Sequence, residues 1–131
     1  MANPSLYSPL VLKNFSLKNR IVVSPMCQYS AEQGFATDWH LVHLGQFAIG
    51  AAGAVIQEAT SVSPEGRITY GDLGIWEDGQ IEKYRQITEF IKGQGSIAGF
   101  NWHMQDEKRV QKSLGWVENS SLQRKTMAGK L

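Results

Sequence analysis

Short apolar runs along the first hundred residues predict buried β-strands. Residues 21–23 form a continuous Ile-Val-Val triplet that Pro25 closes, since proline lacks the N–H that a strand ladder needs. Residues 54–60 contain adjacent strand formers followed by turn residues, and a third strand is expected to begin within residues 96–99. Unbroken apolar runs are typical of parallel strands covered on both faces, so we expect the first strand to be buried on both.

Two amphipathic stretches separate these strands and predict helices. Residues 39–50 carry apolar side chains at approximately helical spacing and end at glycine. Residues 81–91 repeat apolar positions at intervals of three and four, with charged residues on the remaining face. Asp38 and Asp78 precede the two stretches and are the expected N-caps. Strands and helices together predict an α/β fold.

Residues 10–17 predict a small hairpin ahead of the first buried strand. Two apolar stretches flank Lys13 and Asn14, and asparagine tolerates the positive φ of a tight turn.

The composition excludes several classes of protein. The chain has 131 residues, 42% of them hydrophobic, and a net charge of +1, which favours one small globular domain and no nucleic-acid or membrane partner. No apolar run approaches the roughly 18 residues of a spanning helix. The amino terminus does not have the pattern of a secretory signal, and the single cysteine cannot form an internal disulfide. We therefore expect a cytoplasmic protein.

Candidate chemistry follows the first strand, at the end where α/β folds bind ligands. Backbone amides, the thiol of Cys27 and the phenol of Tyr29 are presented there. Glu58, near the end of the second strand, fits either a general base or a structurally paired carboxylate, and we favour the pair. His40 and His43 are three residues apart on the first helix, but a third metal ligand at suitable spacing is missing, so packing or a local hydrogen bond is the favoured account.

Two long motifs in the same order resemble the old yellow enzyme family of flavin-dependent ene-reductases, in particular its bacterial-type branch. They are RIVVSPMCQYS at residues 20–30 and IQEATSVSPEGRITYGDLGIW at residues 56–76, and the resemblance runs from about Leu6 to Gly99. It implies a (β/α)8 TIM barrel, which typically takes about 250 residues. This chain would supply the hairpin and about three βα units, an incomplete barrel.

The resemblance also implies a cofactor and a reaction. FMN would lie over the barrel mouth, accept electrons from NAD(P)H and pass a hydride from its N5 to the β-carbon of a small activated alkene such as an enone. The residues that match the flavin-contacting positions are Ser24, Pro25, Met26, Cys27 and Ala59. Tyr29 matches the phenol that hydrogen-bonds the substrate carbonyl. The family's substrate-binding histidines and its basic residues for N1 and the phosphate lie on later strands, so little or no independent FMN binding is expected.

The pattern changes after Gly99. Residues 1–99 hold seven Lys/Arg and nine Asp/Glu, whereas residues 100–131 hold six and three, so the formal charge moves from −2 to +3. Read one base out of frame, the codons permitted for the segment from Gly99 can spell IQLAHAGRKAST, the continuation that the resemblance implies. We therefore expect residues 1–99 to be the barrel portion and residues 100–131 to be an out-of-family basic tail, either disordered or translated out of frame. A nucleic-acid-binding arm is the less favoured interpretation of this tail, because its aromatic and basic residues show no repeating arrangement.

Two functions from different classes remain. The first is an FMN-dependent NAD(P)H oxidoreductase, inactive as this short chain. The second is a non-catalytic barrel fragment that pairs with a separately encoded remainder, forms homo-oligomers, acts as a decoy for intact subunits or is a decayed gene product. Unpaired strand edges favour association and aggregation in either case.

Overall fold

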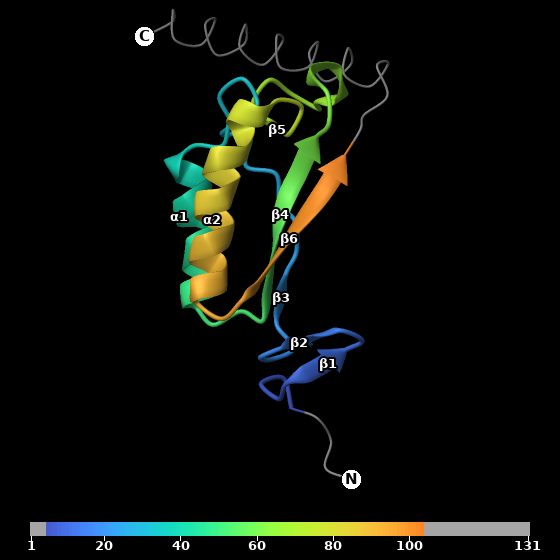
Figure 1. Ribbon diagram of the computed structural model, residues 1–131, viewed down its shortest axis with the longest axis vertical. Helices are drawn as coiled ribbons and strands as arrows, with labels where there is room; N and C mark the ends of the chain where they lie inside the picture. Colours follow the sequence, from blue (N-terminus) through green and yellow to red (C-terminus); the bar gives the residue numbers. More distant parts are fainter. Residues whose placement is uncertain (1–4, 104–131) are drawn as a thin grey trace, which may run out of the picture.

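The structure, a computed structural model, describes residues 5–103. Its helices and strands form an α/β arrangement (Figure 1). The elements in chain order are β1 (Leu10–Leu12), β2 (Phe15–Leu17), β3 (Val22–Val23), α1 (Asp38–Ile49), β4 (Ala54–Ser61), η1 (Pro64–Gly66), β5 (Leu73–Gly74), η2 (Asp78–Gln80), α2 (Ile81–Gly93) and β6 (Ile97–His103). Both α-helices lie on the same side of the parallel sheet.

β4 is the central strand of this sheet. β3 and β6 both pair in parallel with Ala54 and Val55, so they must lie along opposite edges of β4. β5 and β6 both pair with Thr60 and Ser61, which places β5 on the same edge as β3. One edge of β4 is therefore paired with β3 at its start and with β5 at its end. The chain that leads from β3 to α1 leaves the sheet between these two paired stretches.

A β-bulge interrupts the pairing of β4 with β6. Ile56 pairs with Gly99 and Ala59 pairs with Asn101, so three steps along β4 correspond to two along β6. The extra residue lies within 57–58. Bulges of this kind change the direction in which the following side chains point.

The hydrophobic core lies between the helices and the sheet. Its buried members come from both helices, from β4 and β5, and from the adjoining loops: Ala36, Leu44, Ala48, Ala52, Val55, Leu73, Tyr84, Ile87 and Ile91. The two helices supply five of these side chains at helical spacing, so the periodicity of the sequence identified the faces that pack on the sheet.

The predicted hairpin is confirmed as β1 and β2, with Leu10 opposite Leu17. It lies at the amino end of the parallel strands (Figure 1), where Leu17 is buried and Lys18 Nζ donates to the carbonyl of Gln94. The positive φ of 47° falls on Lys13, however, and not on Asn14. The hairpin is thus a structural element beneath the sheet, remote from the carboxyl ends of the strands.

The structure corrects three details. Val22 is 50% exposed, because Val23 packs against the core between the helices and the sheet and alternation turns Val22 to the opposite face, so the expectation of burial on both faces was wrong. Thr37 is the N-cap of α1, one residue before the expected Asp38. Glu77 is the N-cap of η2, one residue before the expected Asp78, and the N-cap of α2 itself is Gln80. Thr37 and Glu77 both have the extended dihedrals typical of an N-cap.

The third parallel strand extends beyond residues 96–99, within which the sequence predicted that it would begin. β6 runs to His103 and pairs with β4 as far as Ser61, so residues 100–103 continue the sheet past Gly99. The expectations for the rest of the tail concern residues 104–131, which lie outside the described residues. Neither α1 nor α2, within residues 5–103, is long and apolar enough to cross a membrane.

Candidate functional site at the carboxyl end of the sheet

The segment after β3 is exposed at the carboxyl end of the sheet. Ser24, Pro25 and Met26 are exposed, and Cys27 and Gln28 are half-buried. Pro25 cannot donate to a ladder, and the strand pairing ends at Val23. The segment therefore leaves the sheet and passes the part of β4 that lies between its pairing with β3 and its pairing with β5.

Cys27 and Ala59 meet at this crossing. The backbone N–H of Ala59 donates to the Cys27 sulfur, although the two residues come from different elements. Burial raises the pKa of the Cys27 thiol against the opposing effect of that N–H, and the carboxylates of Glu58 and Asp72 add to the rise. Cys27 is therefore a protonated thiol near neutral pH, in contact with the backbone of Ala59, a small and buried residue.

Tyr29 projects from the same segment in an unusual backbone conformation. Its φ is 54°, in the left-handed region that residues with a side chain rarely adopt, and its side chain is 53% exposed. Partial burial raises the pKa of the phenol, and the neighbouring Cys27 acts in the same direction. The Tyr29 hydroxyl therefore keeps its proton, which it donates to the Cys27 sulfur in this structure.

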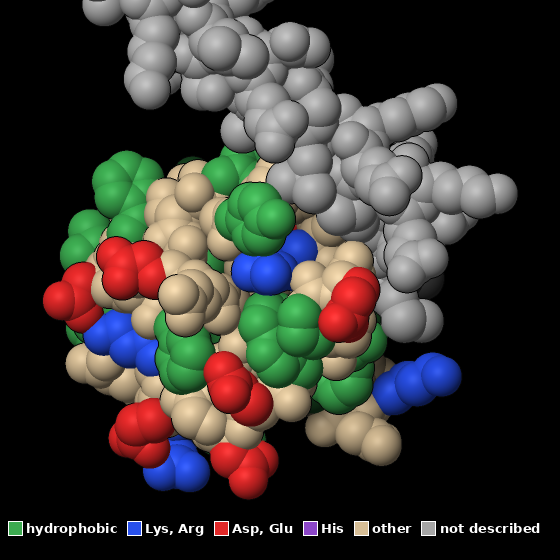
Figure 2. All heavy atoms as spheres, turned by 90° about the horizontal axis from the view of Figure 1, so that it is seen from above, with side chains coloured by type: hydrophobic (Ala, Val, Ile, Leu, Met, Phe, Trp, Pro, Cys, Tyr) green, Lys and Arg blue, Asp and Glu red, His purple; other side chains and the backbone are tan. Residues whose placement is uncertain are grey.

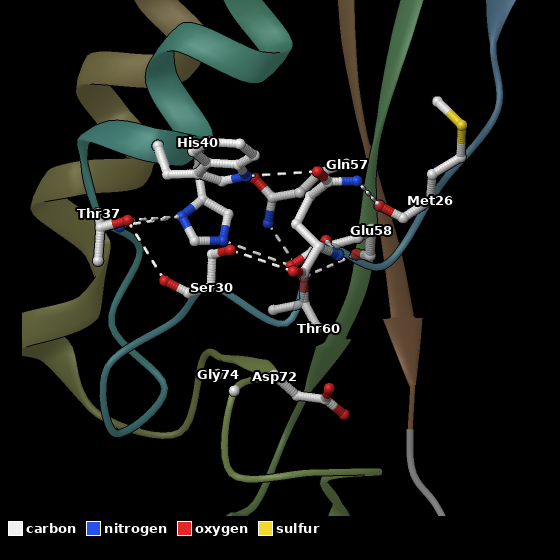
Figure 3. Close-up of polar contacts among 12 residues, drawn as sticks. Met26, Ser30, Thr37, His40, Gln57, Glu58, Thr60, Asp72 and Gly74 are labelled. Carbon is white, nitrogen blue, oxygen red and sulfur yellow. Dashed lines mark hydrogen bonds and ion pairs between the residues drawn. The ribbon is translucent and has the colours of Figure 1, made fainter. Parts of the chain in front are cut away.

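Glu58 lies directly behind this segment and is paired. Its side chain is buried, Oε2 accepts a hydrogen bond from the backbone N–H of Gln28, and Oε1 lies 3.4 Å from Nε2 of His40 (Figure 3). The favoured expectation, a structurally paired carboxylate, is confirmed. The partner comes from the first turn of α1, so the contact joins the strand to the helix.

The hydrogen bonds of His40 fix its tautomer. Nδ1 accepts from the backbone N–H of Thr37 at 3.0 Å, and a backbone N–H can only donate, so Nδ1 carries no proton. The proton of the neutral ring is then on Nε2, which faces the Glu58 carboxylate. His40 is 1% exposed and belongs to the interior of the fold.

Gln28 connects these groups and was not identified from the sequence. Beyond its N–H bond to Glu58, its side chain donates to the carbonyl of Met26 at 2.9 Å and accepts from Nε1 of Trp39 at 3.3 Å. Ser30 Oγ donates to the Gln28 carbonyl at 3.1 Å. Its position between Cys27 and Tyr29 was the only available signal, because none of these partners except Met26 and Ser30 is close in sequence.

The two helix histidines do not form a metal site with their neighbours. No group of three potential metal ligands occurs among residues 5–103. His43 stacks on Trp39 and meets Phe47 edge to face, and burial lowers its pKa. The enclosed space bordered by His40, His43 and Glu58 measures about 10 Å³, roughly one water molecule. Packing and local hydrogen bonding account for both histidines.

The loop after β4 contacts the segment after β3 and is held in place by its own side chains. Arg67 donates to the carbonyl of Pro64 at 2.9 Å, and its guanidinium lies 5.4 Å from the Tyr70 ring and 5.2 Å from the Trp76 ring. Asp72 is buried and accepts from the backbone of Ile68 and Thr69. Both side chains stabilise the loop itself.

Figure 2 looks onto the carboxyl end of the sheet. Apolar side chains lie among separate acidic and basic ones over the part of this face formed by the described residues, and no area of it carries a single sign of charge.

These residues fit one side of a flat, partly apolar ring. An exposed run of residues, a soft thiol and a small buried residue lie together. Neither residues 24–30 nor residues 58–61 include Lys or Arg. The cluster is thus suited to contact a ring and unsuited to neutralise a phosphate.

Comparison with known proteins gives consistent matches. The sequence model of the NADH:flavin oxidoreductase / NADH oxidase family matches residues 5–118. The NADPH dehydrogenase of Bacillus subtilis (strain 168) is 49% identical over 96 residues, which are 72% of this chain and 28% of that protein.

Two solved structures match the fold. Morphinone reductase has a TM-score of 0.72 at 29% identity, covering 79% of this chain and 27% of its own. The old yellow enzyme homologue from Zymomonas mobilis has a TM-score of 0.71 at 31% identity, covering 77% and 28%. The chain thus spans about a quarter of the length of the relatives it matches. The family match extends beyond Gly99, and a division of the chain at that residue stays a prediction.

Proposed function

The chain belongs to the NADH:flavin oxidoreductase / NADH oxidase family, and we propose that it carries the first part of an FMN-dependent oxidoreductase that reduces the C=C bond of activated alkenes such as enones. The family depends on FMN and takes its electrons from NAD(P)H. The expected fold, the opening portion of a (β/α)8 barrel, is confirmed by the matches to old yellow enzyme structures. The observation that carries the proposal is the meeting of Cys27, Tyr29 and Ala59 at the carboxyl end of neighbouring parallel strands.

Each residue of the cluster has a proposed role. The exposed backbone of Ser24, Pro25 and Met26 would border the flavin, with Cys27 beside the ring as a soft neighbour and Ala59 leaving room for it. When bound, FMN supplies the hydride. Tyr29, whose phenol stays protonated, would donate a hydrogen bond to the substrate carbonyl and stabilise the negative charge that develops there. We place the reaction in the cytoplasm, where the single thiol stays reduced.

We further propose that this chain binds FMN weakly or not at all by itself. The cluster has no cation for the phosphate, and β3 and β6 each have one edge without a neighbouring strand among the described residues. A flavin bound only along one side keeps much of its surface in water and gains little affinity from the protein.

A second candidate, an interaction module, is supported by a specific surface. α1 exposes Trp39, Val42 and Ile49, whose exposed fractions are 55%, 69% and 67%, and one edge of β3 has no neighbouring strand among the described residues. A helix and parallel strand from a separately encoded barrel remainder would cover this face. Flavin binding that appears only in the presence of such a remainder would join the two candidates in one assembly.

A chimaera tests the catalytic proposal. Residues 5–99 replace the matching 28% of the Bacillus subtilis NADPH dehydrogenase, to which they are closely similar. We expect the purified chimaera to show flavin absorbance and NADPH-dependent reduction of 2-cyclohexenone. Tyr29→Phe should lower kcat on the order of 10²-fold, as the loss of one transition-state donor does. Tyr70→Phe, which alters an exposed phenol in the adjoining loop, is the control. A folded chimaera without flavin would overturn the proposal.

A further inference from the structure

We propose that Glu58 is a positioning residue that holds residues 27–29 in the conformation that presents the Cys27 thiol and the Tyr29 phenol. The inference rests on the proposed function only for what those two side chains contact. Its physical basis is the arrangement of hydrogen-bond donors around one buried carboxylate (Figure 3).

Glu58 faces two donors and needs two acceptor atoms. The backbone N–H of Gln28 always donates, and it points to Oε2. Nε2 of His40 lies 3.4 Å from Oε1, and it must carry the ring proton because Nδ1 accepts from Thr37. The carboxylate accepts the Gln28 N–H with Oε2 and faces His40 Nε2 with Oε1 at ion-pair distance, while Nε2 makes no hydrogen bond among the described residues. A carboxamide of the same shape has one oxygen and would direct an N–H group at one of the two donors.

The bond to Gln28 acts at the centre of the segment. Gln28 lies between Cys27 and Tyr29, and the chain reverses at Tyr29 through a φ of 54° that side-chain-bearing residues rarely adopt. Such a conformation persists only where the surroundings impose it. The Glu58 carboxylate fixes the residue just before the turn, and the hydrogen bond from Ala31 N–H to the Gly71 carbonyl, 2.9 Å, fixes the chain just after it.

The bulge in β4 explains how a strand residue reaches this position. Val55 faces the helices as part of the core, so strict alternation would turn residue 58 away from α1. The extra residue within 57–58 changes the alternation, and Glu58 faces His40 on α1. Ala59 follows on the strand with its N–H at the Cys27 sulfur. The bulge thus brings the Glu58 carboxylate behind the segment and the Ala59 N–H to the thiol.

The test measures amide exchange and thiol reactivity of the full 131-residue chain without flavin. We expect the Gln28 amide of the wild type to exchange slowly, and Glu58→Gln to raise its exchange rate about ten- to hundred-fold, the loss expected for a bond to a charged acceptor. Glu58→Gln should also lower the midpoint pH of Cys27 alkylation, because it removes a nearby negative charge and loosens the segment. Amides of β4 and β6 should change little relative to Gln28.

Ser96→Ala is the matched control. It removes another buried hydrogen bond, from Ser96 Oγ to the carbonyl of Ala52 at 2.6 Å, at the amino end of the sheet. This variant should leave the Gln28 amide and the Cys27 alkylation midpoint unchanged even where it lowers global stability.

Three results would overturn the inference. The first is a wild-type Gln28 amide that exchanges as fast as in the unfolded chain, a measurement that needs no variant. The second is equal effects of Glu58→Gln and Ser96→Ala on Gln28, and the third is an alkylation midpoint that Glu58→Gln does not move. Because none of these readouts involves flavin, they stand apart from the chimaera experiment, whose failure would leave the positioning role of Glu58 intact.

Discussion

Gly71 lies directly against the backbone of Tyr29. A Cβ atom at residue 71 would stand 2.5 Å from the Tyr29 carbonyl oxygen and 2.8 Å from its carbonyl carbon, closer than real Cβ contacts allow. The carbonyl of Gly71 accepts the N–H of Ala31 at 2.9 Å, so the loop after β4 and the segment after β3 are joined backbone to backbone. Glycine is required here by this close approach, since its own φ is not in the left-handed region.

Gly71→Ala should therefore destabilise the chain by about 1–3 kcal/mol, as overpacking against rigid backbone does. Gly93→Ala is the control, because a Cβ there meets nothing within 4 Å and alanine favours the helix that Gly93 ends. That substitution should stabilise by about 0.5–1 kcal/mol. Urea unfolding measures the change in free energy of unfolding for each variant. Equal free energies of unfolding for Gly71→Ala and Gly93→Ala would contradict the account of Gly71.

Tyr84→Phe should destabilise the chain by about 1–2 kcal/mol near neutral pH. The hydroxyl is buried and donates to the carbonyl of Gly74 at 2.7 Å, which ties α2 to β5. Tyr70→Phe provides the comparison, because Tyr70 is 69% exposed, and a change within about 0.5 kcal/mol is expected for it. Urea titrations measure the free energies of unfolding of both variants. A Tyr84→Phe variant as stable as the wild type would refute the hydrogen bond from Tyr84 to Gly74.

The stability difference between wild type and Tyr84→Phe should shrink above pH 10. Burial raises the pKa of Tyr84 well above its ordinary value of 10.0, so the folded chain keeps this proton when the unfolded chain releases it. The unfolded state is then favoured as the pH rises above 10, and wild type loses stability that the phenylalanine variant does not lose. Unfolding free energies at pH 8 and at pH 11 measure the difference, and a constant difference would contradict the raised pKa.

Cys27 should be alkylated by iodoacetamide with a higher midpoint pH in the folded chain than in the chain unfolded in urea. Burial raises the pKa of the thiol, and the thiolate is the reactive form. The chain has a single cysteine, so the reaction reports on this group alone. A lower midpoint in the folded chain would indicate a thiolate-stabilising site, which this geometry does not provide.

Local features of the fold were already determined by the sequence. The apolar spacing of the helices, the stop at Pro25 and the turn at Lys13–Asn14 depend on neighbours within a few residues, and all appear in the structure near the predicted positions. The motif around Cys27 and Tyr29 identified the family, because a long run of specific residues after a strand carries more information than periodicity does. The N-cap of α1 was displaced by one residue because Thr37 and Asp38 can both cap, and only the structure shows that Thr37 has the extended dihedrals of a cap.

Only the tertiary structure decided how the site is assembled. Glu58 reaches His40 because of a bulge whose presence depends on the pairing of β4 with β6, and no local pattern marks it. Gln28 has hydrogen-bond partners on α1 and β4. Gly71 must be glycine because the backbone of Tyr29, some forty residues earlier, lies against it. Contacts of this kind depend on register and close packing between elements distant in sequence, whereas local periodicity reports only which face of an element is buried.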